Sequence, residues 1–144
     1  PLDTKRTDIE LSPDIPVQSE ETPRSDRHHS ILIAEDVYEN YFLLETLFGK
    51  QYQLYHALNG QEAIDMFETY HPDLILMDIK MPVMDGFEAT RRIRTLSKTI
   101  PIIALTAFAF EREKEIAKQC EFTDYVVKPI DIKELKKLIV KVLA

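Results

Sequence analysis

Five short apolar runs alternate with segments of helical periodicity over most of this chain. Apolar runs of this length, each bounded by polar residues, are typical of strands buried in a parallel sheet. The five expected strands are Ser30–Ala34, Tyr52–Ala57, Leu74–Met77, Ile102–Leu105 and Tyr125–Val127. The second strand alternates polar and apolar residues, which predicts an edge strand with one wet face. Parallel strands need crossover connections, so the alternation predicts an α/β fold with helices on both faces of the sheet.

Apolar residues at helical spacing, together with helix start signals, define the helices expected between these strands. A first helix is expected over about 38–49, and a second helix is expected to end at Pro72. The expected buried stripes are Val37, Tyr41, Leu44 and Phe48 in the first helix, and Ala63, Met66, Phe67 and Tyr70 in the second. The start signals of later helices are Asp85 with Glu88, and Asp131 with Glu134, both spaced as capping boxes.

The helical segment before the last strand is different, because residues 111–115 are polar on every side. Only Ile116, Ala117 and Cys120 are expected to be buried there. A weakly buried helix is a candidate moving or docking element. An ordinary solvated helix explains the same pattern, so both interpretations stay open.

Polar side chains follow four of the five apolar runs. Glu35 and Asp36 follow the first run, Asp78 the third, Thr106 the fourth and Lys128 the fifth. Because ligands of open parallel sheets bind at the carboxyl ends of the strands, we expect these side chains to converge. Three neighbouring carboxylates repel one another unless a cation neutralises them, and oxygen ligands with free water positions favour Mg²⁺. The set therefore suits a divalent metal and a phosphoryl group.

Each of these residues also has an ordinary explanation when it is taken alone. A lone Asp at a strand end usually caps a helix, and this role stays open in part for Asp36. A lysine after an apolar strand usually lies at the surface. Lys128 would instead face the acids, so an ion pair with Asp78 is the better interpretation.

Two small features beside these strand ends complete the expected site. The hydroxyl of Thr106 can donate to a phosphoryl oxygen, and the small Ala107 leaves room above it. Pro129 lacks a backbone donor and ends the last strand. The Lys128–Pro129 bond is a candidate for the cis form.

Composition narrows the class of protein. The chain has 144 residues, 44% of them hydrophobic and 30% charged, which is ordinary for one soluble globular domain. The net charge of −7 argues against sequence-independent nucleic-acid binding by this chain. The single cysteine fits a reducing compartment, so a cytoplasmic location is expected, with a membrane anchor elsewhere in the parent protein left open. No apolar stretch has membrane-spanning length, and no secretory signal is recognised.

The chain divides into residues 1–29 and residues 30–144. The first region has no aromatic residue, three interior prolines, and seven Asp or Glu against four Lys or Arg. Such a segment cannot bury enough apolar surface to offset its ordering entropy, so we expect a disordered or extended linker. Residues 30–144 are expected to fold as one domain. The chain begins at Pro1 rather than Met, as a fragment or a processed product does.

Several stretches in order resemble the response-regulator receiver domain of two-component signalling. They are Ile-Leu-Ile-Ala-Glu35-Asp36, Leu-Ile-Leu-Met-Asp78-Ile-Lys-Met-Pro82-Val-Met-Asp-Gly86, Ala-Leu-Thr106-Ala107 and Asp-Tyr125-Val-Val-Lys128-Pro129. Any one stretch is a weak signal, but all of them at these separations are specific, and the resemblance covers nearly all of residues 30–144. It implies a doubly wound, flavodoxin-like parallel sheet with the strand order 2-1-3-4-5.

The resemblance also implies a phosphoryl-transfer site. Asp78 would be the phosphoacceptor, attacking a phosphohistidine on a histidine kinase or a phosphotransfer domain. Asp36, Asp78 and the backbone carbonyl of Lys80 would hold Mg²⁺, with Glu35 acting through water. Lys128 would neutralise charge on the transferring phosphoryl group, together with the metal.

A conformational switch is implied as well. Thr106 would follow the phosphoryl group, with Ala107 beside it, and Tyr125 would turn inward into the space vacated. Populations would shift between two surfaces around helix four, strand five and helix five. Lys80 and Phe108 would flank the path of the hydrolytic water, and the bulk of Phe108 is expected to slow dephosphorylation. Phosphorylation-dependent dimerisation is left open.

Two other classes of protein compete with this interpretation. An aspartyl-phosphate phosphohydrolase would carry a second Asp two residues after its nucleophile, where this chain has Lys80. A pseudo-receiver would lack the acceptor, a member of the acidic pair or the lysine, and all of these are present. The domain is therefore not expected to be an independent enzyme, although it would catalyse its own phosphorylation and dephosphorylation.

The parent protein is inferred from likeness alone. The given sequence ends just after the last helix, and a long segment precedes the first strand. We therefore expect no output domain after this one, and a parent protein that is a hybrid sensor histidine kinase with this domain as its carboxyl-terminal receiver. The segment from Met81 to Arg94 resembles receivers of that type most. The alternative is a receiver whose DNA-binding output domain lies outside this chain.

Overall fold

The computed structural model describes residues 29–107, 115, 116 and 118–144. Within these ranges, five strands and four complete helices alternate along the chain. Their bounds are β2 Ser30–Ala34, α1 Tyr38–Phe48, β3 Gln53–Ala57, α2 Gly60–Tyr70, β4 Leu74–Asp78, α3 Gly86–Leu96, β5 Ile102–Thr106, β6 Asp124–Val127 and α5 Ile132–Leu143. Each expected strand is present, with ends that differ by one residue or less.

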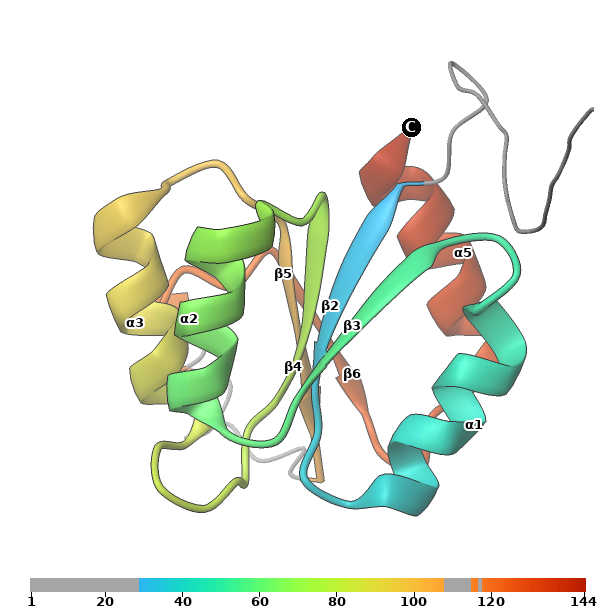
Figure 1. Ribbon diagram of the computed structural model, residues 1–144, viewed down its shortest axis with the longest axis horizontal. Helices are drawn as coiled ribbons and strands as arrows, with labels where there is room; N and C mark the ends of the chain where they lie inside the picture. Colours follow the sequence, from blue (N-terminus) through green and yellow to red (C-terminus); the bar gives the residue numbers. More distant parts are fainter. Residues whose placement is uncertain (1–28, 108–114, 117) are drawn as a thin grey trace, which may run out of the picture.

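The five strands form one parallel sheet in the order β3-β2-β4-β5-β6. This is the predicted order 2-1-3-4-5, and the alternating strand β3 lies at an edge as expected. Helices α1 and α5 cover one face of the sheet, and α2 and α3 cover the other (Figure 1). The predicted doubly wound, flavodoxin-like α/β fold is therefore confirmed.

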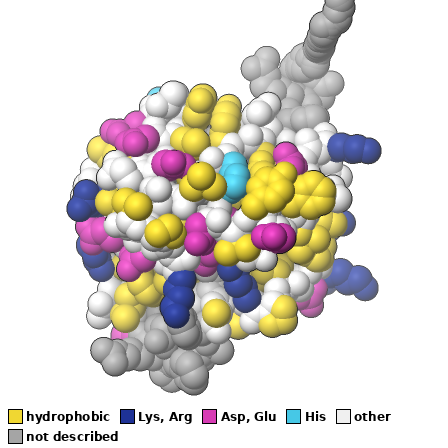
Figure 2. Space-filling view, turned by 60° about the horizontal axis from the view of Figure 1, so that its bottom comes forward, with side chains coloured by type: hydrophobic (Ala, Val, Ile, Leu, Met, Phe, Trp, Pro, Cys, Tyr) yellow, Lys and Arg dark blue, Asp and Glu magenta, His cyan; other side chains and the backbone are white. Residues whose placement is uncertain are grey.

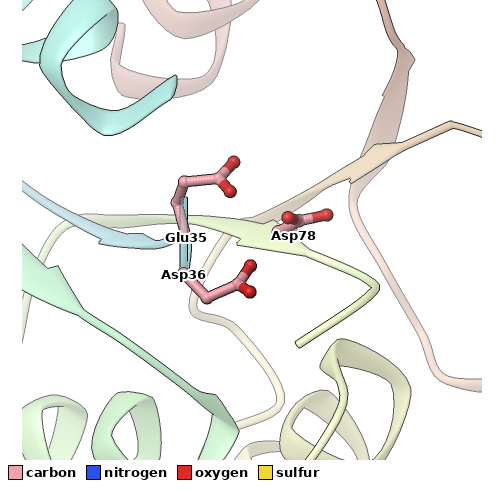
Figure 3. Close-up of side chains that lie close together, drawn as sticks. All are labelled: Glu35, Asp36 and Asp78. Carbon is pink, nitrogen blue, oxygen red and sulfur yellow. The ribbon is translucent and has the colours of Figure 1, made fainter. Parts of the chain in front are cut away.

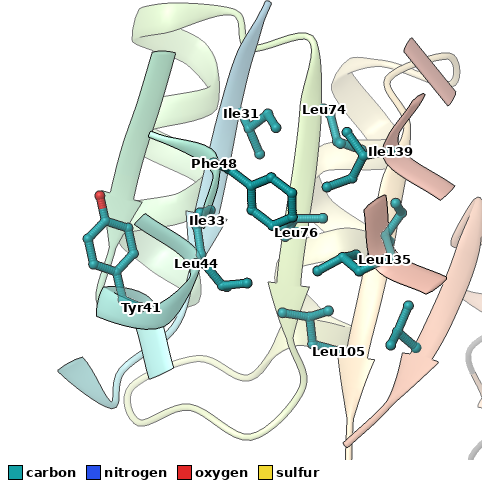
Figure 4. Close-up of a cluster of buried hydrophobic side chains, with 12 residues drawn as sticks. Ile31, Ile33, Tyr41, Leu44, Phe48, Leu74, Leu76, Leu105, Leu135 and Ile139 are labelled. Carbon is teal, nitrogen blue, oxygen red and sulfur yellow. The ribbon is translucent and has the colours of Figure 1, made fainter. Parts of the chain in front are cut away.

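Burial of the central strands on both faces explains why their sequences are continuously apolar. Every residue of β4 and β5 is buried, and so are Ile31–Ala34 of β2. Alternate residues point to two separate cores. The core under α1 and α5 includes Phe48, Leu76 and Leu135 (Figure 4), and the core under α2 and α3 includes Phe67, Met77 and Ile93.

Side-chain caps begin three of the helices. Asn59 accepts a hydrogen bond from the backbone N–H of Glu62 at 2.9 Å. Asp85 accepts one from Glu88 at 2.8 Å, as the spacing of these two residues predicted. Asp131 accepts bonds from the backbone N–H groups of Lys133 and Glu134. Caps of this kind fix where a helix starts, and so fix the lengths of the loops that precede it.

Each of the two predicted helix stripes has one terminal residue wrong, Val37 in the first and Tyr70 in the second, while Phe48 and Ala63 at the other ends are buried as predicted. Val37 is 43% exposed because it is the N-cap of α1 and lies beyond the edge of the core. Tyr70 is 48% exposed, and Ile64 occupies the buried position in α2 instead. The ring of Tyr70 still stacks on Tyr55, with 4.2 Å between ring centroids, so it shields the edge strand rather than filling the core.

Some expectations concern residues outside the described ranges. These include residues 1–28 of the linker expected over 1–29, the first part of the polar helical segment, Ala117 and Phe108. Within the described part of that segment, Cys120 is buried as predicted, whereas Ile116, which was also predicted to be buried, is half-buried. Among the described helices, none has the length and apolar character required to span a bilayer.

Candidate functional site

Parallel pairing of β2 with β4 brings the acidic residues together. The register aligns Ala34 with Met77, so the residues that follow these strands emerge side by side. Carboxylate oxygens of Glu35, Asp36 and Asp78 lie within 4.8 Å of one another (Figure 3). The convergence predicted from the four strand ends is therefore present for the three acids, at the carboxyl edge of the sheet.

Lys128 closes the acidic cluster from the β6 side. Its Nζ lies 3.3 Å from Oδ2 of Asp78 and 3.4 Å from Oε1 of Glu35. The ion pair with Asp78 was predicted, whereas the pair with Glu35 was not. The backbone N–H of Lys128 donates to the carbonyl of Thr106 at 2.7 Å, and the Lys128–Pro129 bond is in the cis form. The lysine is thereby anchored to the end of β5.

Glu35 is the most deeply buried of the three acids, with a relative exposure of 1%. Its carboxylate accepts hydrogen bonds from the backbone N–H of Val37 at 3.1 Å and from the side chain of Asn40 at 3.4 Å. Glu35 thus accepts the hydrogen bond of a backbone N–H group at the start of α1. The N-cap residue itself, Val37, makes no capping hydrogen bond with its side chain. The capping role left open for Asp36 is not seen, and its exposed side chain adjoins the cluster.

Burial and crowding change the acidity of Asp78. Desolvation, followed by repulsion from Glu35, raises the pKa of Asp78 to about 6, and the ammonium of Lys128 opposes this rise. Three carboxyl groups thus lie beside a single lysine side chain. Three oxygen-bearing side chains of this kind fit a hard divalent cation such as Mg²⁺, which would favour the ionised form of Asp78.

The other predicted residues surround this cluster. Thr106 is buried at the end of β5, one residue beyond the partner of Asp78 in the sheet, and the adjacent Ala107 is exposed. Lys80 is exposed and lines a cleft of ≈ 500 Å³ that Asp36 also lines. Tyr125 lies in the edge strand β6 with 38% of its surface exposed. Thr106 and Tyr125 lie on strands that end at this edge of the sheet, and Lys80 and Ala107 lie in the loops that follow β4 and β5.

The face that carries the site mixes charge with apolar surface. Figure 2 shows acidic and basic side chains next to hydrophobic ones on this face. A larger cavity, of ≈ 620 Å³, lies between the carboxyl ends of α2 and α3 and the start of β5. None of the three clustered acids lines it, so it belongs to a different part of the molecule.

Comparison with known proteins identifies the family of this chain. The sequence profile of the response regulator receiver domain matches residues 31–140. The chain belongs to the response regulator receiver family.

Two curated relatives match the receiver over very different fractions of their own length. It is 38% identical to the regulatory protein AtoC of Escherichia coli over 114 residues, which are 78% of this chain but 25% of AtoC.

The second curated relative is sporulation initiation phosphotransferase F of Bacillus subtilis. It is 34% identical over 117 residues, which are 81% of this chain and 94% of the relative. The receiver thus spans a quarter of the length of one relative and nearly all of the other. Receivers of this kind therefore occur both within long proteins and almost alone.

Two solved structures share the fold. One is the receiver domain of a sensor histidine kinase from Pseudomonas aeruginosa with a magnesium ion in its active-site cleft. Its TM-score is 0.76 at 33% identity, and the match covers 81% of this chain and 98% of that one. The other is a co-crystal from Saccharomyces cerevisiae of a histidine phosphotransfer protein with the receiver of its downstream response regulator. Its TM-score is 0.74 at 31% identity, covering 79% and 88% of the two chains.

One residue beside the site had no signal in the sequence. His56 of β3 lies with its Nε2 2.7 Å from the backbone carbonyl oxygen of Glu35. A histidine within an alternating edge strand gives no indication that it reaches the end of the neighbouring strand. Only the pairing of β2 with β3 places it there.

Proposed function

We propose that Asp78 accepts a phosphoryl group from a phosphohistidine of a partner protein. A carboxylate oxygen of Asp78 attacks phosphorus, the P–N bond to the imidazole breaks, and an acyl phosphate forms while the imidazole keeps the bonding electron pair. The observation that supports this most is the convergence of three acids and Lys128 at one edge of the sheet.

Charge neutralisation is the main task of the surrounding residues. Asp36, Asp78 and the carbonyl of Lys80 would hold Mg²⁺, and Glu35 would contribute through water. The bound metal would supply positive charge at the phosphoryl oxygens. Lys128 faces Asp78 at 3.3 Å and would move to an oxygen of the transferred group, because phosphorylation replaces its present partner by a more highly charged one.

Phosphorylation would change the conformation at the end of β5. The hydroxyl of Thr106 would donate to a phosphoryl oxygen above Ala107, and the loop after β5 would follow it inward. Tyr125, on the adjacent strand, would then turn inward. The surface formed by helix four, β6 and α5 would change, and a downstream partner would distinguish the two states.

The donor and the parent protein are inferred from the relatives. A histidine kinase or phosphotransfer domain suits the site, as the co-crystal with a histidine phosphotransfer protein illustrates for a related receiver. Likeness to the receiver of a sensor histidine kinase supports a hybrid kinase as the parent. The alternative, a regulator with a separate DNA-binding output domain, is supported by the match to a quarter of AtoC.

The acceptor is tested with radiolabelled acetyl phosphate, with and without Mg²⁺. The receiver is expected to gain one phosphoryl group in a Mg²⁺-dependent reaction, and the Asp78→Asn variant is expected to gain none. The Asp131→Asn variant, which changes an exposed acid at the start of α5, serves as the matched control and should label like the wild type.

Other outcomes of this experiment would contradict the proposal. Labelling that persists in Asp78→Asn would place the acceptor elsewhere. Release of many phosphates per chain without a stable phosphoprotein would indicate a hydrolase. Absence of labelling in the wild type, from acetyl phosphate and from phosphohistidine donors alike, would indicate a binding module that is never phosphorylated.

A further inference from the structure

His56 contacts the backbone at the end of β2. It is the fourth residue of the edge strand β3 and pairs with Ile33 in the sheet. Its Nε2 lies 2.7 Å from the carbonyl oxygen of Glu35. A carbonyl oxygen can only accept a hydrogen bond, so Nε2 must carry the proton and donate. The carbonyl belongs to the peptide group that joins Glu35 to Asp36.

A second hydrogen bond fixes the other side of the same residue. The backbone N–H of Glu35 donates to the carbonyl of Ala57 at 3.0 Å. The backbone of Glu35 is therefore attached to the end of β3 through both its N–H and its C=O group. These two hydrogen bonds extend the contact between β2 and the edge strand β3 past the end of β2, to the backbone of the acidic pair.

Stacking on Tyr41 fixes the orientation of the His56 ring. The two ring centroids are 3.7 Å apart, and the ring planes differ by 1°. Tyr41 is itself buried in α1, with a relative exposure of 7%, and belongs to the core under that helix (Figure 4). The imidazole therefore cannot rotate away from the carbonyl without losing its contact with a buried residue of α1.

The position of the Asp36 carboxylate depends on these backbone contacts more than the position of the Glu35 carboxylate does. The carboxylate of Glu35 is held by three groups, on Val37, Asn40 and Lys128. Asp36 is exposed, so the position of its carboxylate follows from the backbone that precedes it. Removing a side chain that orients a metal ligand usually weakens metal binding 10- to 100-fold. We expect a smaller loss of affinity when the side chain orients the ligand through the backbone.

We propose that His56 is a positioning residue of the metal site, which it serves by holding the Glu35–Asp36 peptide group through Nε2. His56 has this role only if the acidic cluster binds Mg²⁺, as proposed above. Its donor raises the affinity for the metal and leaves the phosphoryl-transfer step itself unchanged. The imidazole touches neither the metal nor the phosphoryl group.

The experiment compares His56→Gln with His56→Met. The two side chains are similar in length, but only glutamine has a donor that can replace Nε2. Binding of Mn²⁺ is measured by electron paramagnetic resonance, with MgCl₂ as the competitor. We expect affinity about 3- to 10-fold weaker than wild type for His56→Met, and within about 2-fold of wild type for His56→Gln.

Phosphorylation provides a second readout. With acetyl phosphate at low Mg²⁺, labelling of His56→Met is expected to be slower, and at saturating Mg²⁺ its rate should return to within about 2-fold of wild type. The control is Tyr55→Met, which removes an aromatic stack from the same strand without touching Glu35, and its affinity should not change. His56→Phe keeps a ring for stacking on Tyr41 but has no donor, so it should behave like His56→Met.

The outcomes separate the role of His56 from the function of the site. Equal metal affinity of wild type, His56→Met and His56→Phe would overturn the positioning role and leave Asp78 as the acceptor. Equal weakening by His56→Gln and His56→Met would also overturn it, because the donor would then be irrelevant. A wild-type receiver that binds no Mn²⁺ and gains no label would overturn this role and the proposed function together.

Discussion

The protonation of Asp78 is decided by its surroundings within a few ångströms. Burial and Glu35 favour the neutral acid, and Lys128 favours the carboxylate. The same crowding that makes the cluster unstable by itself makes it suited to bind a cation. Asp78 is therefore unlike an ordinary surface aspartate, whose pKa lies near 4.

The raised pKa of Asp78 predicts how stability depends on pH without metal. Between the ordinary value of 3.8 and the value of about 6, the folded protein binds more protons than the unfolded chain. Its free energy of unfolding should therefore fall as pH rises through this window, by about 2–3 kcal/mol from this group. Urea denaturation in EDTA at pH 4.5 and at pH 7.5 measures the difference.

The Asp78→Asn variant shows whether this pH dependence comes from Asp78. In this variant, most of the fall in the free energy of unfolding between pH 4.5 and pH 7.5 should disappear. The variant should also be more stable than wild type at pH 7.5, because asparagine carries no charge to bury. Saturating Mg²⁺ should reduce this difference in stability, because the metal is expected to bind the wild type more tightly than the variant. A wild type that becomes more stable between pH 4.5 and pH 7.5, relative to Asp78→Asn, would contradict the assignment.

At the scale of elements, the start of α3 is packed against the end of β4. The backbone N–H of Gly86 donates to the carbonyl of Ile79 at 2.8 Å. A Cβ atom at Gly86 would lie 2.3 Å from the carbonyl oxygen of Asp78 and 3.0 Å from Cα of Ile79. The glycine is needed for this close approach, which sets the position of the strand end that carries Asp78.

The Gly86→Ala variant should therefore be destabilised by about 1–3 kcal/mol, because backbone cannot move aside as a flexible side chain can. The shift should also displace Asp78 and slow its labelling by acetyl phosphate at saturating Mg²⁺. Urea denaturation and initial labelling rates measure the two effects. Gln61→Ala, at an exposed position of α2, is the control and should change stability by less than about 0.5 kcal/mol. A Gly86→Ala variant with wild-type stability would show that β4 and α3 can separate freely.

At the scale of the whole molecule, one buried arginine connects segments that are distant in the sequence. Arg94 of α3 is 6% exposed, and its guanidinium donates to the carbonyl oxygens of Ile100 at 2.7 Å, Glu121 at 2.9 Å and Ser97 at 3.3 Å. These carbonyls belong to the connection into β5 and to the segment before β6. Arg94 therefore joins two connections through three carbonyl groups, at the end of the molecule away from the acidic site.

Replacing Arg94 by methionine should lower the free energy of unfolding by about 2–4 kcal/mol, because several carbonyl groups would lose a charged donor. The control is Arg92→Met, since Arg92 is exposed and forms a surface ion pair with Glu88 at 2.9 Å. That change should cost about 1 kcal/mol or less. Equal denaturation midpoints for the two variants would show that the buried contacts of Arg94 contribute nothing. Labelling of Asp78 in folded Arg94→Met should remain, since the site lies at the opposite end of the strands.

The sequence was most informative where a local rule decides the outcome. The order of the strands followed from the resemblance to receivers, whereas the strands themselves followed from apolar runs such as Leu74–Met77. The edge position of β3 followed from its alternating pattern. Helix starts followed from Asp85 and Asp131, because a cap uses only residues within one turn. Val37 and Tyr70 were assigned wrongly, because periodicity does not reveal where the core ends.

By itself the sequence determined that acids and a lysine stand at the ends of buried parallel strands, since strand ends and polar residues are properties of single segments. The tertiary structure alone decided how these groups interact. Lys128 lies between Asp78 and Glu35, and His56 reaches a carbonyl on the next strand. Such contacts join residues up to 93 positions apart, and depend on strand register and burial, which no single segment contains.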